Sequence, residues 1–295
     1  MNTRHRRQDI ELLRILSALA VVAYHSQVAG LEAAYAGLIV FVVLSVHLAV
    51  TAQAARPPTL ASHARRLLLP WSIWFLFYGS FNLATGRALI PLEGGVVAGV
   101  LAGPSIHLWY LPFIFGTLTL LAPLTARVDK QRLAWVSALA FLLLFVSLPF
   151  WRRWSLGLVL PLPQYLHASG GVLAGLFFGC APQLKTAVRW RLTAAMLLAV
   201  ASVLPFEGIG LPYLIGITVS AAVLLSPRSL VTGVDFSEPA ACTLGIYLLH
   251  PFLLGVAHKY HLVSGLMLPV DVFVASGLLV WLFRRGVPGV AALAV

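Results

Sequence analysis

Charged residues are scarce in this chain, and acidic residues are the scarcest. Only 10% of the 295 residues are charged, and Asp and Glu together number 9. A soluble globular domain carries about 25% charged residues, so the composition argues against an ordinary soluble domain. The 2 cysteines, Cys180 and Cys242, fall in apolar segments, so no disulfide framework is indicated.

Long apolar stretches dominate what remains, since 60% of the residues are hydrophobic. Their length indicates membrane-spanning helices rather than the short alternating strands of a barrel. We predict an all-α integral membrane protein, a bundle of about ten transmembrane helices. The expected spans are 12–30, 36–54, 68–85, 107–126, 133–151, 164–181, 190–206, 209–226, 240–258 and 266–283.

The basic residues give this bundle an orientation. With the N-terminus in the cytoplasm and alternating sides, 16 of the 20 Lys and Arg residues, including Arg4, Arg6 and Arg56, fall on the cytoplasmic side. Such a bias is the usual topology signal, so both termini are expected in the cytoplasm. The same bias explains the net charge of +11, because the charges lie in short loops, so the basic charge does not indicate a protein that binds nucleic acid.

The chain is expected to form a single transmembrane domain over residues 1–295, with no appended soluble domain. No repeat of fixed period is evident, so the inverted repeat of many transporters is not seen.

Residues 89–103 are apolar but short and broken, and indicate an interfacial or re-entrant segment on the outer side. Arg152 and Arg153, flanked by tryptophans, are either interfacial anchors or contacts to an anionic substrate group.

The first apolar stretch carries two ionisable residues, Arg14 and His25. They are 11 residues apart, which is about 20° beyond three helical turns, so both side chains are expected on one face, about 16 Å apart along the axis. Ionisable groups in a membrane helix cost free energy unless they face protein or water, which makes them functional candidates. The alternative is that Arg14 extends to the headgroups and His25 serves helix packing.

Further histidines are predicted at a similar outer depth. They are His107, His167 and His250, whereas His47 is expected nearer the middle. A histidine accepts and donates protons near neutral pH, which suits general-base catalysis at a hydroxyl, although hydrogen bonding between helices is the alternative role. No His-x-x-x-His pair lies on any span, so no metal site is expected.

Arg65 and Arg66 open the third span on the inner side. Arginine offers forked, charge-assisted hydrogen bonds to phosphate groups. The positive-inside bias alone is the alternative explanation for both residues.

Taken together, these stretches resemble the acyltransferase 3 family of bacterial membrane-bound acyltransferases, which O-acylate carbohydrates. Arg14 and His25 match the opening motif of a basic residue, ten residues and a histidine. The remaining motifs lie in the same order along the chain: 41–45 (FVVLS), 66–70 (RLLLP), 107–111 (HLWYL) and 246–251 (IYLLHP). One departure stands in the second helix, where Val46 and His47 replace the usual glycine and aromatic residue.

The resemblance implies a donor, an acceptor and a set of roles. Acyl-CoA, with acetyl-CoA as the expected donor, would be a co-substrate, and no tightly bound cofactor is expected. Its phosphates would lie near Arg14, Arg65 and Arg66. His25 would activate the hydroxyl of a carbohydrate or glycoconjugate as general base, or carry the acyl group transiently. The residues expected on the acceptor or oxyanion side are His107, Trp109, Tyr110, Tyr247 and His250.

The resemblance also implies a multi-pass protein of the bacterial cytoplasmic membrane, with the lipid bilayer as its surroundings. Two functions from other classes stay open at this point. One is a transporter or flippase for a polysaccharide or lipid-linked sugar, which intramembrane His and Arg residues would also suit. The other is a membrane scaffold without chemistry.

Overall fold

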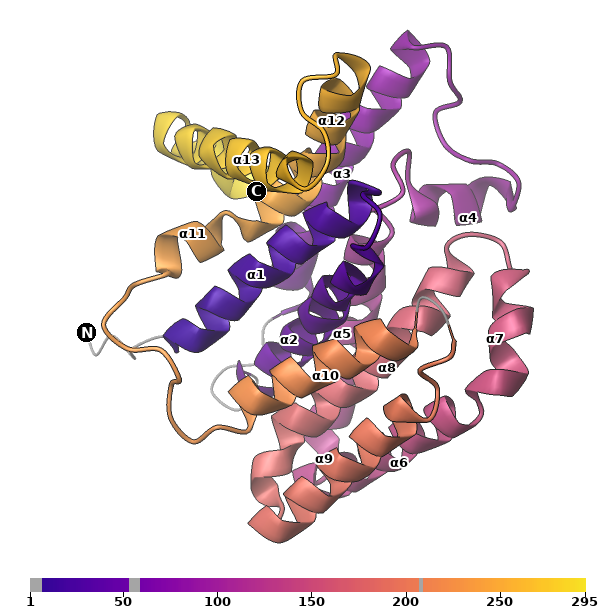
Figure 1. The fold of residues 1–295 in the computed structure, drawn as a ribbon, viewed down its shortest axis with the longest axis vertical. Helices are drawn as coiled ribbons and strands as arrows, with labels where there is room; N and C mark the ends of the chain where they lie inside the picture. Colours follow the sequence, from indigo (N-terminus) through magenta and orange to yellow (C-terminus); the bar gives the residue numbers. More distant parts are fainter. Residues whose placement is uncertain (1–6, 53–58, 207–208) are drawn as a thin grey trace. The chain divides into compact units, whose positions relative to one another are not determined.

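The computed structural model describes residues 7–52, 59–206 and 209–295 (Figure 1). The described residues form helices and loops without a strand, which confirms the predicted all-α class. Arg4, Arg6 and Arg56, which contribute to the predicted charge bias, lie outside the described residues.

Each of the ten predicted spans overlaps a helix, and the span 133–151 extends over two helices. The long helices are α1 (Gln8–His25), α2 (Ala36–Ala52), α3 (Leu60–Ala84), α5 (Tyr110–Arg127), α6 (Lys130–Val146), α8 (Leu162–Cys180), α9 (Thr186–Ala201), α10 (Gly210–Leu224), α12 (Thr243–Lys259) and α13 (Met267–Gly286). Shorter elements join them: η1 (Glu32–Tyr35), α4 (Gly95–Ala102), α7 (Leu148–Leu156), η2 (Ala181–Gln183), α11 (Ser237–Ala241) and α14 (Pro288–Ala294).

The expected span 133–151 is bent. α6 ends at Val146, and α7 leaves it at an angle of 72°. At the break, the Ser147 hydroxyl donates a hydrogen bond to the carbonyl of Leu143. Pro149, which has no N–H, lies in the first turn of α7. Proline suits the start of a helix, so the sequence ends one helix here and begins another.

Part of the chain has the length and apolar character needed to cross a membrane. Among the described residues, three helical segments qualify, Glu32–Ala52, Leu60–Ala84 and Met267–Gly286, and the bent pair α6–α7 is a fourth if it is one span. Large apolar side chains also point outward from the helices, as at Leu76, Leu120 and Leu278. Such surfaces are typical of a membrane protein, while the number of ten spans stays a prediction.

The described residues divide into two compact units. The first unit comprises the described residues up to Phe41, with Leu204–Ala291 and Val295. Within it, α1 packs against η1, α10, α11, α12 and α13, and α12 packs against α13. Its apolar core joins Ala18 and Val22 of α1 to Ile246 and Leu254 of α12 and to Val272 of α13.

The second unit comprises Val42–Val203 with Ala292–Ala294. In it α6 packs against α8 and α9, and α3 packs against α5. The helices α6, α8 and α9 are labelled in Figure 1.

Small residues allow α8 to approach α2 closely. A β-carbon at Gly175 would lie 2.7 Å from the carbonyl oxygen of Val43, and one at Gly179 would lie 2.9 Å from Val50. Close approach over small residues is the usual way in which membrane helices associate.

This contact predicts the effect of one added methyl group. Gly175→Ala should lower the stability by about 1–3 kcal/mol, because the new β-carbon meets the backbone of α2. The matched control is Gly116→Ala on α5, where a β-carbon meets nothing within 4 Å and the substitution should not destabilise. Thermal unfolding in detergent measures both, and equal midpoints for the two variants would contradict the close contact.

Candidate functional site

The predicted face of α1 lies against α12 in the first unit. Near the start of α12, the Arg14 guanidinium donates to the hydroxyl of Thr243 at 3.4 Å. Farther along the same two helices, the rings of His25 and His250 lie 5.1 Å apart between centroids. Thr243 and His250 are about two helical turns apart, so they share a face of α12. The two helices therefore run parallel, and Arg14 and His25 both face the same neighbour.

His25 is the last residue of α1, and its side chain is half-buried. The His250 ring meets it at an interplanar angle of 68°, in an edge-to-face arrangement. His250 is fully buried, and its Nδ1 donates to the carbonyl of Ile246 at 3.2 Å. Tyr247 lies beside His250 at 6.0 Å between ring centroids and beside Phe41 at 6.5 Å. The structure thus brings together three of the predicted site residues: His25, Tyr247 and His250.

Arg14 is held in place at the other end of this face. It forms an ion pair with Glu11 at 2.8 Å, in addition to its bond to Thr243. The Thr243 hydroxyl itself donates to the carbonyl of Ala240 at 2.8 Å, which leaves a lone pair toward Arg14. The Arg14 side chain is still 30% exposed, so it is oriented by these partners and accessible to a ligand.

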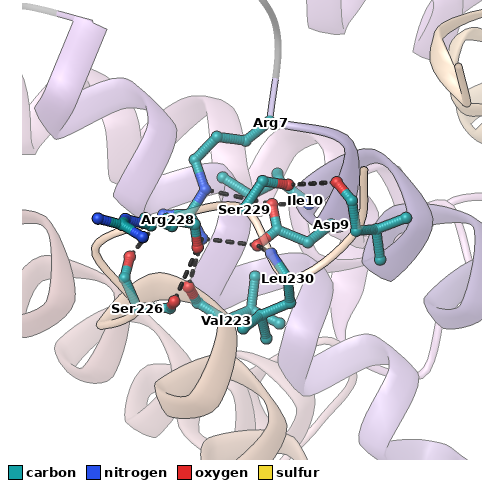
Figure 2. A network of polar contacts seen from close by, with 9 residues as sticks. Arg7, Asp9, Ile10, Val223, Ser226, Arg228, Ser229 and Leu230 are labelled. Atoms are coloured by element: carbon teal, nitrogen blue, oxygen red, sulfur yellow. Dashed lines mark hydrogen bonds and ion pairs between the residues drawn. The ribbon is translucent and has the colours of Figure 1, made fainter. Parts of the chain in front are cut away.

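A polar network that the sequence did not reveal anchors the start of α1 (Figure 2). Arg7 binds both carboxylate oxygens of Asp9, at 2.7 and 3.2 Å, and donates to the carbonyls of Val223 and Ser226 at the end of α10. Cations are favoured at a helix C-terminus because its carbonyl groups carry a partial negative charge. Arg7 therefore fixes the start of α1 to the end of α10.

The Asp9 carboxylate completes this network from the inside. Asp9 is buried and accepts from the backbone N–H groups of Ile10 and Leu230, both at 3.0 Å. Burial alone would raise the pKa of Asp9, but the hydrogen bond and charge of Arg7 and the two N–H groups outweigh it and hold the pKa below its ordinary value. The sequence offers one indication of this role: Asp9 is an acidic residue in the first turn of the first helix of a chain that has few acidic residues.

Three other predicted site residues lie at the start of α5 in the second unit. His107 is buried, with its Nδ1 3.0 Å from the Ser105 hydroxyl and its ring edge-on to Tyr78 at 5.3 Å between centroids. The hydroxyl of Tyr110 is bonded to that of Ser45 at 2.9 Å. Trp109 is buried in an aromatic cluster with Phe113 and Tyr165. These residues form a second polar and aromatic group within their own unit.

The structure does not bring Arg65 and Arg66 to this second group. Both are exposed near the start of α3, whereas Tyr78, the neighbour of His107, lies near its end. The intervening residues of α3 span about 18 Å.

Arg152 is half-buried and Arg153 is exposed on α7, while His167 is buried on α8. His47 is buried on α2.

The described residues contain no group of three or more His, Cys, Asp or Glu side chains suited to a metal ion. Both cysteines are buried and free.

Comparison with known proteins gives one match. The model of the acyltransferase 3 family, described as an acyltransferase domain, matches residues 7–283. Neither the curated proteins nor the solved structures contain a significant match. The matched range includes every residue of the α1–α12 contact described above.

The Asp9 network predicts a pH-dependent loss of stability. Because the pKa of Asp9 is lowered in the folded protein, its carboxylate stabilises the fold above the ordinary aspartate pKa, and this contribution disappears as the pH falls below about 4. Asp9→Asn should therefore lower the unfolding midpoint at pH 7, and the difference from the unmodified protein should shrink toward pH 3. Thermal unfolding in detergent across this range measures it.

The matched control is Asp271→Asn, since Asp271 is exposed on α13. A difference between Asp9→Asn and the unmodified protein that stays constant from pH 7 to pH 3 would rule out the proposed charge effect.

Proposed function

This chain belongs to the acyltransferase 3 family, and from that membership we propose that it is a membrane-bound O-acyltransferase. It would move an acyl group, acetyl in the simplest case, from acyl-CoA to a hydroxyl of a carbohydrate or glycoconjugate. The observation that carries the proposal is the shared face of α1. Arg14 and His25 both contact α12, so a guanidinium and an imidazole lie along one helix contact, which supports the roles that we propose for them.

In this proposal His25 is the general base. One nitrogen of its imidazole takes the proton of the acceptor hydroxyl as the hydroxyl oxygen attacks the thioester carbonyl. The C–S bond then breaks as the ester forms, and the departing thiolate takes up the proton that the His25 imidazole holds, which restores the neutral base. His25 stands at the last residue of α1, where the carbonyl end of the helix stabilises the positive charge that develops on the imidazole.

Arg14 is proposed to bind the phosphate groups of the donor. Its distance from His25 along α1, about 16 Å, suits a donor that is extended between phosphate and thioester. Glu11 and Thr243 hold the guanidinium in one orientation, so less conformational entropy is lost when a ligand binds. Arg65 and Arg66, exposed at the start of α3, are proposed as further donor contacts.

The remaining predicted residues are proposed to serve the acceptor or the oxyanion. Tyr247 and His250 do so beside His25 in the first unit. His107, Trp109 and Tyr110 are assigned to acceptor contacts from the start of α5 in the second unit. Their hydroxyl, imidazole and indole groups are the kinds of donors that bind sugar hydroxyls.

We further propose ten spans with both termini in the cytoplasm and a location in the bacterial cytoplasmic membrane. In that topology α1 runs outward from the cytoplasm, so Arg14 faces the compartment that holds acyl-CoA. The parallel direction of α1 and α12 supports this arrangement, because the first and ninth of ten spans cross the membrane in the same sense.

The base role predicts the behaviour of a His25 variant. His25→Ala should reduce acyl transfer by about 100-fold or more, because a general base contributes about that much to the rate. The assay uses detergent-purified protein, radiolabelled acetyl-CoA and a crude glycoconjugate fraction. His258→Ala, an exposed histidine of α12, is the matched control. Full activity of a folded His25→Ala protein would refute the base role, and acceptor transport without acetyl transfer would favour a flippase.

The donor role predicts a different effect for Arg14. Arg14→Ala should raise the KM for acetyl-CoA by about 10-fold or more, the usual effect of losing a charge-assisted hydrogen bond, with a smaller change in kcat. Arg14→Lys should lie between, since lysine keeps the charge without the fork. Arg191→Ala, on an exposed arginine of α9, should leave the KM unchanged. A donor KM unaffected by Arg14→Ala would remove Arg14 from donor binding.

A further inference from the structure

Pro251 disturbs the hydrogen bonding of α12 beside the proposed base. The proline lies inside the helix and has no N–H, so it cannot donate to the carbonyl of Tyr247, four residues earlier. The side chain of His250, next to the proline, donates to a backbone carbonyl of the same turn, that of Ile246.

The His250 imidazole bonds to the backbone of its own helix, α12. Its Nδ1 lies 3.2 Å from the carbonyl oxygen of Ile246. A carbonyl oxygen only accepts hydrogen bonds, so Nδ1 carries the hydrogen and the tautomer is fixed. With no exposed surface and this backbone bond, the ring is fixed in direction as well.

This fixed ring is the one that meets His25. The two centroids are 5.1 Å apart and the planes are inclined by 68°, which is a favourable edge-to-face geometry. His25 also has a ring contact with Tyr24, its neighbour in sequence, which is exposed. His25 is half-buried at the end of its helix, so its orientation depends on the rigid partner across the contact.

We propose that His250 is a positioning residue that sets the orientation of the His25 imidazole, and that Pro251 helps to keep His250 in place because it offers no N–H that would compete with the imidazole for the backbone carbonyls of this turn. This inference rests on the proposed base role of His25. His250 thus serves the acceptor side through His25: it takes no proton in the reaction, and it aims the nitrogen of His25 at the acceptor hydroxyl. Errors of about 1 Å in such alignment can cost about 100-fold in rate.

The central test separates this role from simple packing. His250→Asn keeps an N–H close to the position of Nδ1, so it should preserve the backbone bond and the unfolding midpoint while removing the ring that meets His25. We expect kcat to fall by about 10-fold or more, as for other partners that orient a reacting group, with the KM for acetyl-CoA within about 2-fold of the unmodified enzyme. A folded His250→Asn protein with unchanged kcat overturns the inference.

Pro251→Ala provides a second variant that leaves His250 itself intact. The restored N–H of residue 251 adds a backbone donor in the turn where the imidazole makes its bond, and this competition loosens the ring. We expect a several-fold lower kcat with no loss of stability, since alanine favours the helix. Pro123→Ala in α5, another proline inside a helix, is the matched control and should leave kcat unchanged.

The same assays distinguish the two proposals. If His25→Ala retains full activity, the base role fails. If His25→Ala is inactive and His250→Asn retains full kcat, only the positioning role fails. Should His250→Asn not fold, Pro251→Ala decides: a reduced kcat at unchanged stability supports the inference, and an unchanged kcat overturns it.

Discussion

A polar group in a membrane helix needs a protein partner, because the hydrocarbon around it offers none. In the first unit this requirement is met mainly along the contact of α1 with α12. Arg14 contacts Glu11 and Thr243, His25 contacts the His250 ring, and His250 in turn donates to the carbonyl of Ile246. Each of these groups would be expensive alone. Together they form one connected set, and the proposed chemistry depends on the geometry that this set imposes.

Much of the helical arrangement could be predicted from the sequence. The ten apolar stretches overlap helices, and Arg14 and His25, whose spacing predicts one shared face, both contact α12. The bend at Ser147 was missed, because the apolar stretch continues through it while Pro149 ends the helix locally. Hydrophobicity records the length of an apolar run, and the backbone donors decide whether that run is one helix or two.

The partners across helix contacts could not be predicted in the same way. Membrane helices are apolar on all sides, so periodicity does not show which face meets which neighbour, and contacts depend on small residues and on single polar groups. The sequence identifies His25 and His250 as candidates but not as neighbours. It also gives no indication that Arg7 reaches the end of α10, because that bond joins residues that are far apart in the chain.

The anchored start of α1 has a consequence for how this helix tolerates insertions and deletions. Asp9 and Arg7 fix the rotation of α1 about its own axis at one end, through bonds to the segment 223–230. Each residue of a helix turns the chain by about 100°. One residue added or removed between Asp9 and Arg14 would therefore swing Arg14 and His25 together to a different side of the helix. The direction in which the proposed site faces around the axis of α1 is thus set at the start of the helix. This stretch of α1 can vary in side chains far more freely than in length.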